Sequence, residues 1–114
     1  MAIAKQFVGI RQSKSEMYSF YVDGTGTAAI GEGKYHGSLT DNGTGDYTVT
    51  LTRPARRALQ VVGIVPVTAN VMPQNLVVDS SSVRVRFVDN DGTPTATDVK
   101  FYLTVLAYYD DQQR

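Results

Sequence analysis

The chain has 114 residues, and its 11 Lys and Arg balance its 11 Asp and Glu to give a net charge of zero at pH 7. This length suits one compact domain, and the absence of Cys excludes disulfides, thiolate metal sites and cysteine catalysis. The balanced charge argues against a dedicated nucleic-acid-binding protein, and the lack of a long apolar run or a signal-peptide core predicts no membrane partner.

The amino-acid composition predicts an all-β protein. Val occurs 15 times and Thr 12 times, while Glu occurs only twice. Val and Thr are β-branched and fit a pleated, half-buried surface, whereas helices favour Leu, Glu, Lys and Ala. The hydrophobic fraction of 42% is enough to build a packed core.

The first 16 residues are the one ambiguous segment. Ile3, Phe7 and Ile10 have a helix-like spacing, whereas Gly9 disfavours a helix. A short helix and an extended arm both fit this pattern, and we favour the arm. We therefore divide the chain into an N-terminal arm, residues 1–16, and a single domain.

Residues 17–114 are predicted to form that domain from seven or eight short strands. Turn dipeptides and glycine-rich stretches bound a series of short runs with alternating or continuous apolar residues. The predicted strands cover residues 18–22, 25–30, 34–40, 46–52, 59–65, 82–88 and 98–109. This spacing is typical of an antiparallel β-sandwich, with jelly-roll or immunoglobulin-like topology.

Three of these strands differ in their patterns. Residues 46–52 alternate between apolar and threonine side chains, so one face is apolar and the other hydroxylated. Residues 59–65 form a continuous apolar run, which predicts a central strand buried on both faces. The alternation in residues 82–88 places Arg84 and Arg86 together on one face.

The sequence contains no recognisable catalytic motif. The single histidine, His36, lies between Tyr35 and Gly37 in a predicted strand, and no Ser occupies a Gly-x-Ser-x-Gly elbow. The glycine-rich residues 24–26 and 31–33 lack the Gly-Lys-Ser/Thr helix start of a phosphate-binding loop. We therefore predict that the protein is not an enzyme and needs no cofactor.

A calcium site is the strongest metal hypothesis, and it is weak. Asp89, Asp91 and Gly92 match part of an EF-hand loop, and Asp98 follows nearby. In that alignment the first ligand position falls on Phe87, which supplies no side-chain oxygen. An Asp-Gly hairpin turn explains the same residues, so we predict no metal.

Two kinds of residue are candidates for a protein interface. Apolar side chains are unfavourable in a solvated tail, and those in the arm are typical of a segment that docks on a neighbouring protein. Arginine is enriched at protein interfaces, although Arg53, Arg56 and Arg57 are equally consistent with a solvated loop. The candidates are Ile3, Phe7, Val8, Ile10, Arg53, Arg56, Arg57, Arg84 and Arg86.

Two segments resemble the small β-sandwich modules of tailed-phage virions. Residues 43–54 read Gly-Thr-Gly-Asp-Tyr-Thr-Val-Thr-Leu-Thr-Arg-Pro, and residues 83–92 read Val-Arg-Val-Arg-Phe-Val-Asp-Asn-Asp-Gly, with residues 101–106 following. Such modules occur in capsid decoration proteins and in tail-fibre or tail-tip proteins. The resemblance implies no catalytic residues. Because the chain is too short to hold a fibre shaft, the resemblance favours a small, stand-alone virion protein.

The expected function is therefore that of a capsid decoration, or cement, protein, which binds the outside of a phage head and stabilises it through protein–protein contacts. Its partners would be the major capsid protein or other virion proteins, together with copies of itself, with a trimer favoured. Its location would be the virion, after synthesis in the host cytoplasm. The alternatives are a tail-fibre or tail-tip module that contacts the host surface, and a carbohydrate-binding module that stacks sugars on tyrosines.

Deletion of residues 1–12 tests the arm hypothesis. Burial of two side chains such as Phe7 and Ile10 on a partner contributes about 3–6 kcal/mol before the ordering entropy is subtracted. We expect the shortened protein to melt with unchanged cooperativity but to lose assembly, as measured by thermal melts and light scattering. If these side chains instead form an extra edge strand on the domain's own sandwich, the deletion will lower the melting temperature by many degrees.

Overall fold

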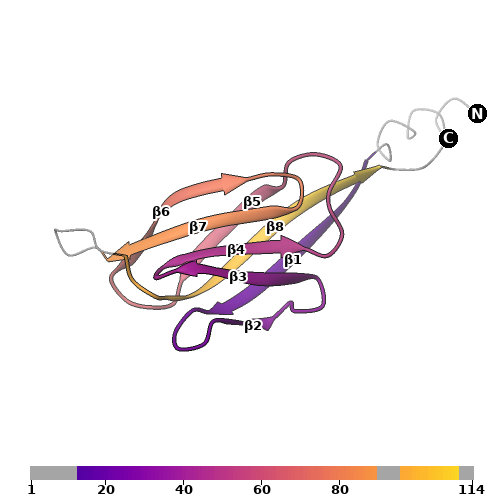
Figure 1. The fold of residues 1–114 in the computed structure, drawn as a ribbon. Helices are drawn as coiled ribbons and strands as arrows, with labels where there is room; N and C mark the ends of the chain where they lie inside the picture. Colours follow the sequence, from indigo (N-terminus) through magenta and orange to yellow (C-terminus); the bar gives the residue numbers. More distant parts are fainter. Residues whose placement is uncertain (1–12, 90–95, 111–114) are drawn as a thin grey trace, which may run out of the picture.

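A computed structural model describes residues 13–89 and 96–110 of the chain. These residues form eight strands and no helix (Figure 1). The strands are β1 (Ser13–Asp23), β2 (Ala29–Glu32), β3 (Gly37–Gly43), β4 (Asp46–Leu51), β5 (Gln60–Pro66), β6 (Val71–Val78), β7 (Ser82–Asp89) and β8 (Lys100–Asp110). Within the same ranges, no helix has the length and apolar character needed to cross a membrane.

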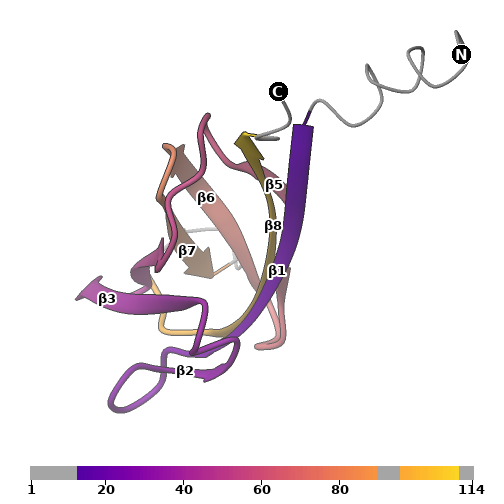
Figure 2. The same cartoon turned by 90° about the vertical axis from the view of Figure 1, so that its right-hand side faces the viewer.

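The strands form two antiparallel sheets of four strands each, which pack face to face (Figure 1, Figure 2). Sheet A has the order β2-β1-β8-β5, and sheet B has the order β3-β4-β7-β6. Hairpins join β1 to β2, β3 to β4 and β6 to β7, whereas the β1–β8 and β4–β7 pairs join distant segments. The predicted all-β, antiparallel sandwich is confirmed.

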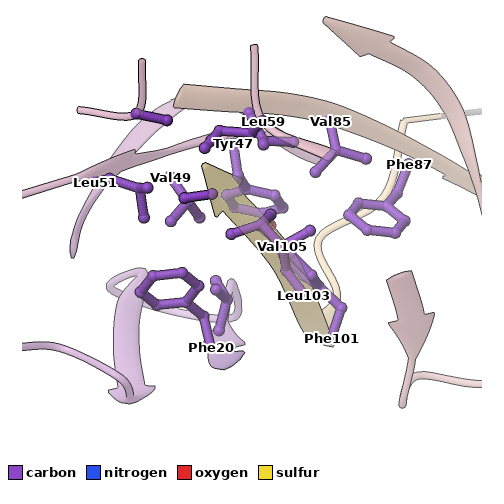
Figure 3. Packing of buried hydrophobic residues seen from close by; sticks show 14 of the residues in the cluster. Phe20, Tyr47, Val49, Leu51, Leu59, Val85, Phe87, Phe101, Leu103 and Val105 are labelled. Carbon is purple, nitrogen blue, oxygen red and sulfur yellow. The ribbon is translucent and has the colours of Figure 1, made fainter. Parts of the chain in front are cut away.

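Side chains from both sheets meet in one core (Figure 3). Along β4, Tyr47, Val49 and Leu51 point inward, because successive side chains alternate between the two faces of a strand. The ring centroid of Phe101 lies 4.7 Å from that of Phe87 and 5.6 Å from that of Tyr47. Burial of one large apolar side chain contributes about 1.5–3 kcal/mol, so this core is the main source of folding stability.

The sequence pattern does not predict strand β6. Pro73, Gln74 and Asn75 interrupt its apolar residues, and the register with β7 shifts between Pro73 and Asn75. A bulge of this kind accommodates an extra residue in one strand. Proline is tolerated because β6 lies at the edge of sheet B, where one side of the strand has no ladder to complete.

Strand β5 corrects a second prediction. The apolar run 59–65 predicted a central strand buried on both faces, whereas β5 is an edge strand of sheet A. Val61 and Ile64 pack against the core, while Val62 and Val65 are exposed. A continuous apolar run therefore arises here because both faces of the strand are apolar, and not because both are buried.

The start of the domain also differs from the prediction. Residues 13–16, which we assigned to the arm, belong to β1 and pair with β8. The remainder of the arm, residues 1–12, lies outside the described residues, as do residues 90–95 in the predicted Asp-Gly turn.

Turns occupy more of the region between β1 and β3 than predicted. Strand β2 covers only four residues, and β3 begins at Gly37. Gly26 and Gly33 have φ angles of 63° and 87°. This left-handed conformation suits a turn and is readily adopted by glycine, so the chain leaves the strand conformation at both points.

The hydroxyl group of Tyr47 connects several segments at the edge of the core. Its oxygen lies 3.0 Å from Asp98 Oδ1 and 3.3 Å from the Gly24 carbonyl oxygen, and it accepts a hydrogen bond of 3.3 Å from the Val99 N–H. Asp98 Oδ1 also accepts a hydrogen bond of 2.9 Å from the Gly45 N–H. Residue 24 must be glycine, because a Cβ there would overlap the Tyr47 hydroxyl. Burial raises the pKa of Tyr47 to about 12.

The Tyr47→Phe substitution measures the contribution of this hydroxyl. It leaves the buried Val99 N–H without its partner, so we expect the free energy of unfolding to fall by about 1–3 kcal/mol. Urea titration measures the change. Tyr35→Phe is the control, because Tyr35 is 84% exposed. Equal effects of the two substitutions would contradict a structural role for the Tyr47 hydroxyl.

Candidate functional site

The outer face of sheet A carries two rows of apolar side chains. The strand register places Tyr21, Tyr102 and Val65 in one row across the sheet, and Met17 and Leu106 in another. Met17 and Val65 are each 59% exposed, and Tyr102 is 45% exposed. We call this surface the apolar face, and it consists of Met17, Tyr21, Val62, Val65, Tyr102 and Leu106.

The two tyrosines of the apolar face are held against each other. The ring centroids of Tyr21 and Tyr102 are 4.9 Å apart, with 47° between the ring planes. Gly31 of β2 lies beside Tyr21, and a Cβ on Gly31 would lie 2.9 Å from the ring atom Cδ2. Between the two apolar rows, the hydroxyl oxygens of Ser19 and Thr104 lie 3.1 Å apart. The face is therefore a defined surface and not a set of isolated side chains.

An apolar outer face is unusual for an antiparallel sheet. Such sheets commonly bury one face on the core and present polar residues on the other. Single exposed apolar residues need no explanation, whereas contiguous apolar surface marks an interaction site. The apolar face is therefore the strongest indication of a binding surface among the described residues.

The outer face of sheet B has the opposite character. Threonine and serine side chains line β4 and the start of β7, and Thr48 lies opposite Arg84 in the register. Asp46 lies opposite Arg86, which in turn pairs with Asn75 of β6. We call the surface formed by Asp46, Asn75, Val77, Arg84 and Arg86 the arginine face.

Asp46 organises the arginine face. Arg84 donates two hydrogen bonds to its carboxylate, from Nε to Oδ1 at 2.9 Å and from Nη2 to Oδ2 at 2.7 Å. Arg86 Nε lies 3.8 Å from Oδ2, and Asn42 Nδ2 lies 3.4 Å from Oδ1. The hydrogen bonds from Arg84 hold the pKa of the Asp46 carboxyl below its ordinary value. The structure therefore brings the two predicted arginines together around a carboxylate that sequence reasoning missed.

The three loop arginines lie between β4 and β5 and are exposed. The Arg53 guanidinium carbon lies 3.9 Å from the ring centroid of Tyr109, whose hydroxyl donates a hydrogen bond of 3.0 Å to the Arg53 carbonyl. The Arg56 N–H donates to the Tyr108 carbonyl at 2.8 Å. Burial raises the pKa of Tyr109 to about 12. Arg53 therefore covers the end of β8, while Arg57 remains an exposed loop residue.

The remaining predicted residues have varied positions. Asp98 accepts hydrogen bonds from the Tyr47 hydroxyl and the Gly45 N–H. Asp89 is the last residue of β7, and Asp91 lies outside the described residues. Among the residues that the structure describes, no three potential metal-ligating side chains cluster. The arm candidates Ile3, Phe7, Val8 and Ile10 also lie outside the described residues.

The aromatic side chains outside the apolar face differ in exposure. Phe20 and Tyr109 are buried in the core, and the Tyr18 hydroxyl lies 3.1 Å from that of Tyr109. The single histidine, His36, is exposed, with its ring centroid 5.1 Å from that of Tyr18. Tyr102 is 45% exposed and belongs to the apolar face.

Comparisons of the chain with protein-family models, with curated proteins and with solved structures give no match.

The Asp46→Asn substitution tests the electrostatic contribution of the arginine face. The pKa of Asp46 is lowered on folding, so its carboxylate contributes stability above the unfolded value near 3.9, and this contribution disappears as the pH falls through the folded pKa. Because Arg84 is half exposed, we expect the substitution to cost about 1 kcal/mol at pH 7. Urea midpoints measured from pH 7 to pH 2 will show this difference shrinking below about pH 4.

The Glu32→Gln substitution is the matched control, because Glu32 is an exposed carboxylate on β2. Its effect is expected to stay within about 0.5 kcal/mol at every pH. A difference between wild type and Asp46→Asn that does not change with pH would contradict the charged pair as its cause.

Proposed function

We propose that this chain is a structural protein that acts by binding other proteins through its apolar face. The observation that carries the proposal is the two rows of exposed apolar side chains on the outer face of sheet A, in one of which the Tyr21 and Tyr102 rings pack together. No chemical step is needed for this function, because burial of the face on a partner is itself the activity.

The energetics of the face suit a repeated, moderate contact. Met17, Val62, Val65 and Tyr102 each have about half of their surface open to solvent. Complete burial of such side chains contributes on the order of 1 kcal/mol each, half of the value for a fully exposed one. The total of several kcal/mol is partly offset by the lost freedom of the two partners. A single contact is therefore weak, and many copies on one lattice bind strongly together.

A virion surface is such a lattice, and the sequence resemblance points to one. The two segments that carry the resemblance contain β4 and β7, which pair directly in sheet B. We therefore assign the protein to the class of capsid decoration proteins, with the major capsid protein as its partner and a homotrimer as the favoured assembly. A tail-fibre or tail-tip position is the alternative within the same class.

A carbohydrate-binding module is the second candidate, and one observation favours it. The paired Tyr21 and Tyr102 rings lie next to the hydroxyl groups of Ser19 and Thr104 on an open sheet face. Aromatic rings with neighbouring hydroxyls are able to stack on a sugar and hydrogen-bond to it. A glycan array separates this candidate from a protein-binding role.

The double substitution Met17→Lys with Val65→Lys tests the proposal. Both side chains are exposed, so we expect the melting temperature to stay within about 4 °C of wild type. Two buried charges at the interface are expected to abolish co-sedimentation with capsid shells assembled from the major capsid protein of the same phage. Tyr35→Lys, which changes an exposed aromatic residue in the turn between β2 and β3, is the control and is expected to bind like wild type.

Wild-type protein that stays in the supernatant, and that light scattering shows to be monomeric, would contradict the proposal. Equal binding by the double variant and wild type would show that another surface makes the contact.

A further inference from the structure

We propose that the arginine face binds a carboxylate side chain of a partner protein, with an apolar residue of the same partner segment packing beside it. The inference rests on the proposed function only in taking the partner to be a protein, because it concerns the opposite sheet and a different chemistry.

The two arginines form a pair on one surface. They are two residues apart on β7, so their side chains point to the same side of the sheet, and their Cα atoms are separated by about 7 Å along the strand. Each side chain is 51% exposed. Strand β7 lies inside sheet B, between β4 and β6 (Figure 1), so its backbone holds both arginines rigidly.

The charge at this surface is not balanced by its own carboxylate. Among the described residues of this surface, two guanidinium groups share the carboxylate of Asp46, which leaves an excess of one positive charge. Asp46 uses the Nε and Nη2 atoms of Arg84, and a guanidinium carries five N–H donors. Arg86 approaches the same carboxylate only to 3.8 Å. The pair therefore retains the capacity to hold a second, incoming carboxylate.

Asp46 acts here as a positioning residue. Its side chain is only 12% exposed, and its two hydrogen bonds fix the plane of the Arg84 guanidinium. A guanidinium held in this way loses little side-chain entropy when it binds a ligand, which is the benefit of preorganisation.

The surroundings of the arginines define the rest of the ligand. An open hollow of about 300 Å³ lies beside them and is lined by Asn75, Leu76, Val77, Arg84 and Arg86. Val77 lies opposite Arg84 in the register, is exposed and supplies an apolar wall. A bare anion would leave that wall in water, whereas an acidic residue and an apolar residue two positions apart on an extended segment point to the same side and cover both parts.

The position of β6 makes the hollow accessible to such a segment. Strand β6 is the edge of sheet B, and its residues 72–77 are all exposed. Pro73 and the bulge beside it interrupt the edge, which disfavours continuous strand pairing along β6. Side-chain recognition by the arginines and the apolar wall is therefore the expected mode, and not the addition of a long strand.

An NMR titration of the isolated ¹⁵N-labelled chain tests the inference. The probe is the capped pentapeptide Val-Ser-Glu-Ser-Val, in which Glu and both Val point to the same side when the peptide is extended, and the control peptide has Gln in place of Glu. We expect the Glu peptide to shift the Nε–Hε signals of Arg84 and Arg86 and the amides of residues 75–77 in a saturable manner. The Gln peptide is expected to bind at least about tenfold more weakly, because it lacks the charge-assisted hydrogen bonds.

The matched variants are Arg86→Gln and Arg57→Gln. Both remove one exposed arginine charge, the first from the arginine face and the second from the loop between β4 and β5. Arg86→Gln is expected to weaken binding of the Glu peptide about tenfold, and Arg57→Gln to leave it unchanged. Arg84 is kept in place, so Asp46 retains its hydrogen-bonded partner.

Two results would overturn the inference. Equal binding of the Glu and Gln peptides would show that the carboxylate is not recognised. Acetate binding with the same affinity as the Glu peptide would show that the rest of the partner segment contributes nothing. Because the titration needs no capsid shell, its failure is distinct from failure of the apolar face to bind one.

Discussion

The pairing of β1 with β8 is the constraint on which the rest of the structure depends. All eleven residues of each strand pair in one uninterrupted register, whereas β2 and β5 join sheet A with register shifts. Side chains alternate strictly along such a ladder, so one register determines both surfaces of the sheet. Phe101 and Leu103 face the core, while Tyr102 and Leu106 face outward. Core and apolar face are therefore products of the same pairing.

The inner face of sheet A is continuously apolar, whereas Ser19 and Thr104 interrupt the outer face, so hydrophobic burial already favours the observed register. Polar contacts add to this preference. The Val99 N–H donates to the Tyr47 hydroxyl, and the Val99 carbonyl accepts a hydrogen bond of 2.8 Å from the Gly24 N–H. A slip of one residue would break these bonds and leave buried polar groups unpaired, which costs about 1–3 kcal/mol for each. The cluster around Tyr47 therefore reinforces the register that the apolar inner face favours.

The sequence predicted the fold class well because apolar and polar residues alternate over strands such as β4 and β7, where one face alone is buried. The prediction was wrong where apolar residues are not buried. The run 59–65 indicated a central strand, but Val62 and Val65 are exposed on β5, which is an edge strand. The prediction also missed Asp46, since the match of that residue to Arg84 and Arg86 depends on a pairing between segments almost 40 residues apart. Alternation of apolar and polar residues is visible within a single strand, whereas the identity of the neighbouring strand depends on residues far away in the sequence.

The two faces differ in range as well as in chemistry. The chain has no net charge, and at physiological salt an excess of one positive charge acts over only about 8 Å. The arginine face is therefore unable to steer a partner from a distance, and its hydrogen bonds form only after contact. Apolar burial has no directional preference, whereas a guanidinium pair held by Asp46 accepts a carboxylate in few geometries. In an assembly that used both faces, the apolar face would supply most of the affinity and the arginine face would set the orientation.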